Sequence, residues 1–110
     1  MSNWKTLVTI LVLVLAIPLL VTAGGDAAKG KAVYTGKCAT CHGPAGEGKE
    51  AIAKMFKVEL RHLGSREVQA KKDAELAKVI SDGTGKMKPV KLTDTEAADV
   101  IAFIRSLAKK

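Results

Sequence analysis

The residues of this chain best suited to chemistry are two cysteines and a histidine in one short stretch, Cys38-Ala39-Thr40-Cys41-His42. The order C-x-x-C-H is the pattern through which haem is covalently attached to a protein. Two thiols at this spacing on the last turn of a helix can form thioethers with the two vinyl groups on one side of a porphyrin. His42 then faces the iron, where a neutral imidazole nitrogen is a strong axial ligand. We therefore predict one covalently attached haem c, held by Cys38 and Cys41 and ligated by His42.

Three other uses of a close cysteine pair stay open. A zinc site would need two further ligands at metal spacing, and His62 is the one other histidine of the chain. A thioredoxin-like dithiol is preceded by a strand, and no strand pattern comes before Cys38. A plain disulfide would close a loop of two residues and would stabilise the fold little. Haem attachment is the interpretation that the motif favours.

A second iron ligand is expected from the glycine-rich stretch Gly83-Thr84-Gly85-Lys86-Met87-Lys88-Pro89. A loop of this composition can fold over a haem. The soft thioether of Met87 suits low-spin haem iron and raises its reduction potential relative to a second imidazole. Two rivals remain. Met55 lies at helical spacing among apolar residues and is expected to pack in the core, and His62 is expected at the surface or beside a haem propionate.

The chain begins with the layout of an export signal. Lys5 is followed by an apolar run from residue 7 to 21, which ends at the small residues Thr22, Ala23 and Gly24. This pattern predicts a signal peptide over residues 1–23, cleaved after Ala23, and leaves the haem-binding domain over residues 24–110. The alternative is an uncleaved anchor, because the run is at the lower limit of a membrane span. In both cases the domain lies in the periplasm or another extracytoplasmic space, free or membrane-anchored.

The rest of the chain predicts short helices and loops. Periodic apolar positions indicate helices after Asp26, over 50–56, around 76–80 and from Thr93 onward, where Thr93 and Glu96 form a capping box. No alternating pattern is long enough for a sheet, so we expect an all-α fold of about four short helices. The 87 residues after the leader contain few aromatic side chains and make a thin core. A large apolar cofactor would fill its centre.

Together these features resemble the small bacterial monohaem class I c-type cytochromes. The resemblance rests on the C-x-x-C-H motif, the loop ending in Met87, and residues at characteristic places, namely Gly30, Tyr34 and 100–105. It implies the class I cytochrome c fold around one haem, with the first and last helices crossing. In that family a glycine on the first helix meets an aromatic residue on the last, and Gly30, Tyr34 and Phe103 would take these places. Proline usually follows the methionine directly, whereas Lys88 intervenes here.

The resemblance also implies a function, which is electron carriage between redox partners and not enzymatic catalysis. With His42 and Met87 on both faces, the iron has no position free for a substrate. The sequence offers no nucleophile, acid–base pair or substrate pocket. If Met87 is not a ligand, a haem-based gas sensor or peroxidase becomes the alternative. If the leader is retained, the alternative is a membrane-tethered haem subunit of a respiratory complex.

The charge of the chain indicates the kind of partner. Lysine and arginine number 18 against 11 acidic residues, and removal of Lys5 with the leader reduces the formal net charge from +7 to +6. Redox partner proteins with acidic docking surfaces would fit this balance. A generally basic surface without a directed role is the alternative, because the lysines are scattered. Nucleic-acid binding is not expected of an exported protein with so few aromatic residues, and membrane contact is expected only if the leader stays attached.

Overall fold

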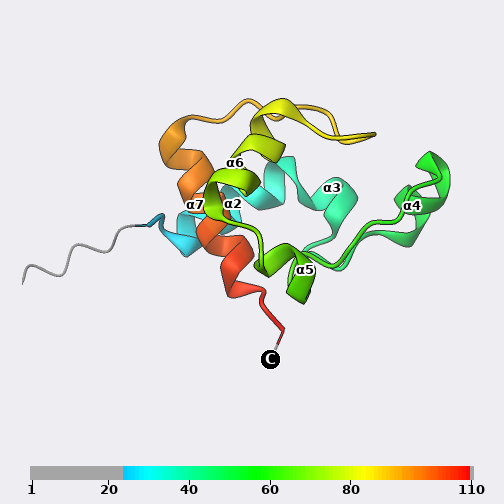
Figure 1. Cartoon of the computed structure of the whole chain (residues 1–110), viewed down its shortest axis with the longest axis horizontal. Helices are drawn as coiled ribbons and strands as arrows, with labels where there is room; N and C mark the ends of the chain where they lie inside the picture. The colour runs from blue at the N-terminus through cyan, green and yellow to red at the C-terminus, as the bar shows by residue number, and fades with distance from the viewer. Residues whose placement is uncertain (1–23, 110) are drawn as a thin grey trace, which may run out of the picture.

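The elements of this protein are helices joined by loops. The computed structural model describes residues 24–109, and its helices in chain order are α2 (Ala27–Lys37), α3 (Ala39–His42), α4 (Glu50–Phe56), α5 (Arg66–Gln69), α6 (Asp73–Asp82) and α7 (Asp94–Ser106) (Figure 1). In this range no strand forms, and one isolated antiparallel bridge joins Thr84 to Met87. The predicted all-α fold is therefore confirmed. The predicted signal peptide lies outside the described residues.

Helix ends fall where the sequence placed its caps. The Asp26 side chain accepts hydrogen bonds from the backbone N–H groups of Ala28 and Lys29, at 2.9 and 3.2 Å, and so begins α2. Thr93 and Glu96 exchange both bonds of a capping box at the start of α7, at 3.0 and 3.1 Å. These bonds satisfy N–H groups that the first turn of a helix leaves without partners.

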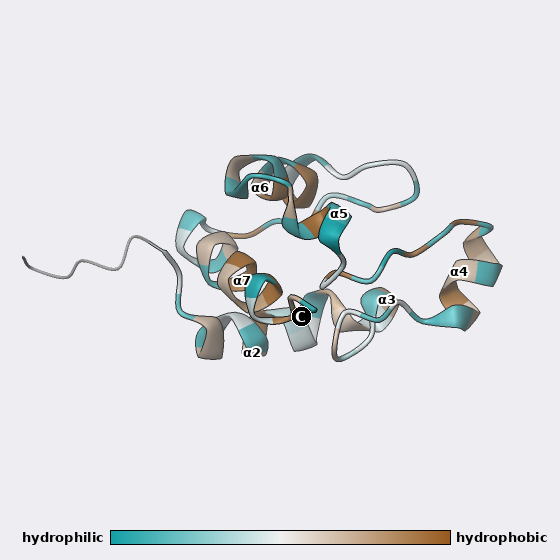
Figure 2. Ribbon diagram, turned by 60° about the horizontal axis from the view of Figure 1, so that its bottom comes forward, coloured by the Kyte–Doolittle hydropathy of each residue, from teal (hydrophilic) through white to brown (hydrophobic). Residues whose placement is uncertain are grey.

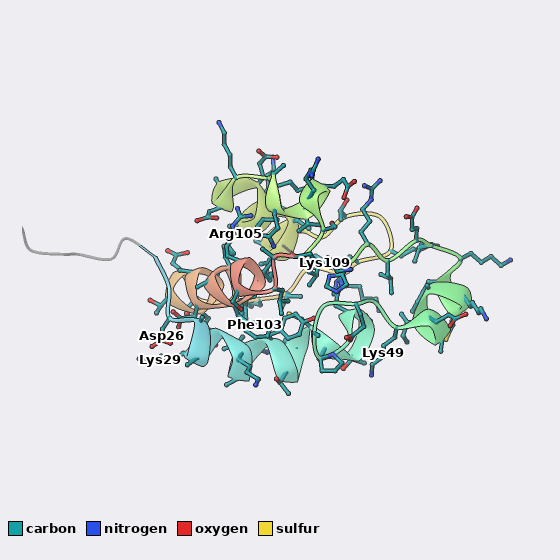
Figure 3. The ribbon with its side chains drawn as sticks, turned by 90° about the horizontal axis from the view of Figure 1, so that it is seen from below. Asp26, Lys29, Lys49, Phe103, Arg105 and Lys109 are labelled. Carbon is teal, nitrogen blue, oxygen red and sulfur yellow. The ribbon has the colours of Figure 1, made fainter. Side chains whose placement is uncertain are left out.

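The first and last described helices, α2 and α7, cross in direct backbone contact. A Cβ atom at Gly30 would overlap the carbonyl of Asp99 on α7, so only glycine fits at the crossing. Tyr34, one turn further along α2, packs its ring on Phe103, with ring centroids 4.9 Å apart (Figure 3). The expectation that Gly30 itself meets the aromatic residue needs adjustment, because Gly30 contacts the α7 backbone and Tyr34 makes the aromatic contact.

The hydrophobic core lies on the other side of α7, against α5 and α6. Its buried members are apolar residues of these three helices: Val68, Leu76, Ile80, Val100, Ile101 and Ile104. Phe103, expected at the margin of the apolar stripe, is itself buried. The last helix therefore uses two faces, one for α2 and one for the core.

The short helix α4 has no buried residue, a property that it shares with the single turn α3. It stands apart from the other helices at one end of the molecule (Figure 2). Met55 is 65% exposed and Phe56 is 43% exposed. The prediction that Met55 packs in the core is therefore wrong: the periodicity forms the helix, but no other described helix packs on its apolar face. In residues 24–109 no helix has the length and hydropathy needed to cross a membrane.

Candidate haem-binding site

The C-x-x-C-H motif forms a helical turn of its own. Helix α2 ends at Lys37, and Cys38 serves both as its C-cap and as the N-cap of α3. The N–H of His42 donates to the Cys38 carbonyl at 3.0 Å, and that of Gly43 donates to the Ala39 carbonyl at 2.8 Å. The motif was expected on the last turn of a longer helix, and a break at Cys38 separates it from α2 instead. The single turn still presents both thiols on neighbouring positions of one face.

The two cysteines are free and half-buried. Burial raises the pKa of the Cys38 thiol, with the charge of Lys37 opposing this shift, so the group is a neutral thiol at pH 7. Both sulfur atoms are therefore free to form the thioethers that would hold a haem.

The His42 imidazole is held in a state suited to ligation. Burial lowers the pKa of His42, so its ring is neutral at pH 7. Its Nδ1 atom is buried and has no hydrogen-bond partner among the described residues. An unpaired buried polar atom costs about 1–3 kcal/mol and is rare in folded proteins. A neutral imidazole with a buried, unpaired nitrogen, directly after two free thiols, fits a haem.

The loop after the motif fastens the turn from its C-terminal side. The carbonyl of His42 accepts from the N–H of Gly48 at 2.6 Å, and that of Cys41 accepts from the N–H of Lys49 at 3.0 Å. The buried hydroxyl of Tyr34 donates to the carbonyl of Gly43 at 2.6 Å. Sequence reasoning placed Tyr34 at the helix crossing and missed this bond. The available signal was that a buried tyrosine hydroxyl needs a partner.

Met87 lies on the strap between α6 and α7, defined here as residues 83–93. Thr84 and Met87 exchange two backbone hydrogen bonds, at 3.0 and 2.8 Å, which close a tight turn. The strap extends toward the end of the molecule that carries α3 and α4 (Figure 1). Met87 is partly buried. The structure thus gives Met87 a local support that is separate from the support of His42.

The two rival ligands occupy different environments. His62 is half-buried, and its Nδ1 atom accepts a hydrogen bond from the N–H of Gly64 at 2.9 Å. A neutral imidazole that accepts at Nδ1 carries its proton on Nε2, which leaves no lone pair there for a metal. Met55 is largely exposed on α4. Among residues 24–109 there is also no group of three or more His, Cys, Asp or Glu side chains placed to hold a metal ion.

Comparison with known proteins agrees with this geometry. The family model described as "Cytochrome c" matches residues 27–108. A solved structure of the KustC0563 c-type cytochrome is similar to this chain with a TM-score of 0.62 and 27% sequence identity, covering 73% of this chain and 98% of that one. No curated protein sequence matched the chain.

Proposed function

This chain belongs to the cytochrome c family, and we propose that His42 and Met87 ligate the iron of its haem while it shuttles single electrons outside the cytoplasm. It is a small class I c-type cytochrome, a kind of protein that binds haem c covalently and transfers electrons through it. Members of the family are typically electron carriers and not enzymes. We further propose that Cys38 and Cys41 attach the haem, that the protein acts in an extracytoplasmic space, and that its partners have acidic docking surfaces.

One observation carries the proposal, and it is the state of His42. Its Nδ1 atom is buried without a partner, and its ring is neutral because burial lowers its pKa. The two free cysteines lie on the same turn. In the described part of the chain, no other histidine combines these properties, since the Nδ1 atom of His62 already accepts a hydrogen bond.

Each residue of the site has a distinct task. Cys38 and Cys41 would hold the porphyrin by thioether bonds, and His42 and Met87 would supply a nitrogen and a sulfur ligand to its iron. When bound, the haem supplies one-electron redox chemistry. Two protein ligands leave no coordination position for oxygen or a substrate, which favours electron carriage over gas sensing or peroxidase activity. The fixed turn at His42 keeps the donor atom in place in both redox states.

The compartment and the partners follow from sequence features. The apolar segment over residues 7–21 supports export to the periplasm or another extracytoplasmic space. A formal net charge of +6 after loss of the leader favours partners with acidic docking surfaces, met in weak and transient complexes.

The ligands are tested by absorption spectra of the holoprotein, matured in the periplasm of an expression host. In Met87→Ala we expect the oxidised protein to lose the weak long-wavelength band of a methionine–iron bond. Met55→Ala is the matched control, because it removes the same side chain from exposed α4. A band that survives Met87→Ala would refute ligation by Met87, and a high-spin wild type would support the gas-sensor or peroxidase alternative.

Export is tested on the same protein by mass spectrometry. We expect a chain that begins at Gly24 and carries one haem. A full-length chain recovered with the membranes would instead support the tethered subunit of a respiratory complex.

A further inference from the structure

A hydrogen bond from the helix crossing reaches the residue that follows the proposed iron ligand. Tyr34 lies on α2 and is 0% exposed, and its hydroxyl donates to the buried carbonyl of Gly43 at 2.6 Å. Its ring packs on the ring of Phe103 of α7, at an interplanar angle of 50°. The phenol is therefore held by packing at the ring and by a directional bond at its oxygen.

The backbone around Gly43 leaves little freedom on the C-terminal side of His42. Gly43 has a φ of 80°, which favours glycine, and its N–H closes α3 by donating to the Ala39 carbonyl. The peptide between His42 and Gly43 is bonded through both of its polar atoms, because the His42 carbonyl accepts from Gly48. The next carbonyl, that of Gly43, accepts from the Tyr34 hydroxyl at 2.6 Å and, at the longer distance of 3.2 Å, from the N–H of Gly46. Without the hydroxyl it would keep only the longer backbone bond and lose the bond that joins it to α2.

Packing alone does not require this hydroxyl. A phenylalanine ring would fill the same space against Phe103 and would avoid the cost of burying an oxygen. The Tyr34 hydroxyl instead makes a hydrogen bond to Gly43, the C-cap of the turn α3 that carries His42. Burial is the main reason that the pKa of Tyr34 rises to about 12, so the hydroxyl stays protonated as a donor at physiological pH.

We propose that Tyr34 is a positioning residue for His42: its hydrogen bond to Gly43 fixes the turn α3 and thereby the direction of the imidazole toward the haem iron. The inference rests on the proposed ligation by His42 and extends it into the helix crossing. The crossing of α2 and α7 then supports the ligand as well as the fold. A change that shifts Tyr34 would change the iron–imidazole bond.

The test compares two changes of opposite direction at Tyr34. Tyr34→Phe removes the donor and keeps the ring. Because the chain has a single tyrosine, growth on 3-fluorotyrosine changes Tyr34 alone and makes its hydroxyl a stronger donor. The readout is the set of hyperfine-shifted proton resonances of the His42 ring in the oxidised holoprotein, followed down to the acidic pH at which the imidazole leaves the iron.

We expect Tyr34→Phe to shift these resonances and to raise the equilibrium constant for imidazole detachment about threefold to tenfold, the effect of one hydrogen bond. The 3-fluorotyrosine protein is expected to shift both quantities the other way. Ile104→Val is the control, because it weakens the core on α7 without touching α3. It should lower the unfolding midpoint and leave the His42 resonances unchanged.

Two results would overturn the proposal. The first is a Tyr34→Phe protein that behaves as Ile104→Val does, with a lower unfolding midpoint and unchanged His42 resonances. The second is a 3-fluorotyrosine protein identical to wild type, and this test remains even if Tyr34→Phe does not mature. Failure of the His42 ligation itself is distinguishable, because wild type would then show no hyperfine-shifted His42 resonances.

Discussion

The two proposed iron ligands are supported in very different ways. His42 lies on a turn that is tied to α2 through the bond of Tyr34 to Gly43, and α2 in turn packs on α7 at the buried crossing. Met87 lies on a strap that is held by the Thr84–Met87 pair of backbone bonds, by a bond from the Val90 N–H to the Ile80 carbonyl, and further along by Val90 and Leu92, which are partly buried against the core. The turn that carries His42 is thus tied to the buried helix crossing, whereas the nearest supports of Met87 are the backbone hydrogen bonds of its own tight turn.

This difference predicts an order of events on unfolding. Segments with few buried contacts open at lower free energy than the core does. The Met87 strap should therefore leave the iron in a local opening, while His42 stays bound until the helices separate. Substitutions in the two regions should accordingly change different observables.

The largest effect is expected at the helix crossing. Gly30→Ala would place a Cβ against the Asp99 carbonyl and force α2 away from α7. We expect a loss of about 3 kcal/mol in apparent unfolding free energy, at the upper end of overpacking effects. Guanidinium titration of the holoprotein, followed by circular dichroism, measures it. His42 should leave the iron in the same transition, because the turn that carries it is supported by the crossing of α2 and α7.

A matched control lies on the same helix. Gly36 is also part of α2, and a Cβ added there meets nothing within 4 Å. Gly36→Ala should stabilise the protein by about 0.5–1 kcal/mol, because alanine loses less backbone entropy in a helix. Equal destabilisation by both substitutions would contradict the close-contact explanation for Gly30.

The strap is expected to respond to Gly83→Ala. Gly83 has a φ of 76°, and its added Cβ would lie 2.5 Å from the carbonyl oxygen of Met87 and 2.9 Å from the backbone nitrogen of Pro89. Strain and contact together should destabilise the strap by about 2 kcal/mol. The methionine–iron band should then disappear at a lower guanidinium concentration, while helical circular dichroism is retained. Loss of both signals together would mean that the strap is not a separate unit.

A second glycine in the strap separates strain from contact. Gly85 has a φ of 54°, and its Cβ would have nothing within 4 Å. Gly85→Ala should therefore cost about 1 kcal/mol from left-handed strain alone. If Gly85→Ala destabilises the strap as much as Gly83→Ala does, backbone strain explains both losses and the contacts of the Gly83 Cβ with Met87 and Pro89 do not contribute.

A substitution at Arg105 should weaken the packing of α5, α6 and α7 without changing the strap. Its guanidinium donates to the carbonyls of Gln69 and Lys71 and to the Asp73 carboxylate, so it joins α7 to the chain between α5 and α6. Arg105→Met should lower the unfolding free energy by about 1.5 kcal/mol, mostly through the lost carbonyl bonds. The methionine–iron band should persist until global unfolding.

The control for Arg105 is an exposed ion pair. Lys54 and Glu50 lie 3.0 Å apart on α4, with side chains more than 70% exposed. Lys54→Met should change stability by less than about 0.5 kcal/mol, as for other surface pairs. A larger loss of stability in Lys54→Met than in Arg105→Met would contradict the view that α7 is held by contacts with other helices and α4 is not.

Much of the fold could be predicted because its signals are local. The Asp26 cap, the capping box of Thr93 with Glu96 and the apolar period of α7 each depend on residues a few positions apart. The C-x-x-C-H motif is local as well, so its place on one turn followed from its spacing. The short helix α5 was missed, because its four residues carry too little periodicity to indicate a helix.

Contacts between distant segments were beyond the sequence. The bond from Tyr34 to Gly43 joins two helices, and its partner is a backbone carbonyl that no residue type reveals. The exposure of Met55 has the same origin, since its apolar period predicts a helix but not whether another element covers it. The roles of Met87 and His42 as ligands stay predictions of the motif and the loop, supported by the environment in which each lies.

An effect that is absent at neutral pH is expected at Tyr34. Its pKa in the folded protein is about 12, raised chiefly by burial, against 10.0 for an ordinary tyrosine. Below pH 10 the hydroxyl is protonated in both folded and unfolded chains, and stability does not depend on it. Above pH 10 the unfolded chain loses the proton first, so the unfolding free energy falls between pH 10 and 12, by about 1 kcal/mol at pH 11. Guanidinium midpoints of wild type and Tyr34→Phe at pH 9 and pH 11 measure this, and the variant should lack this part of the decline. Because the folded protein keeps the Tyr34 proton until the pH approaches 12, the His42 resonances should stay unchanged up to about pH 11. An equal decline in both proteins would place the alkaline sensitivity elsewhere, and the Met87 strap would be the next region to test.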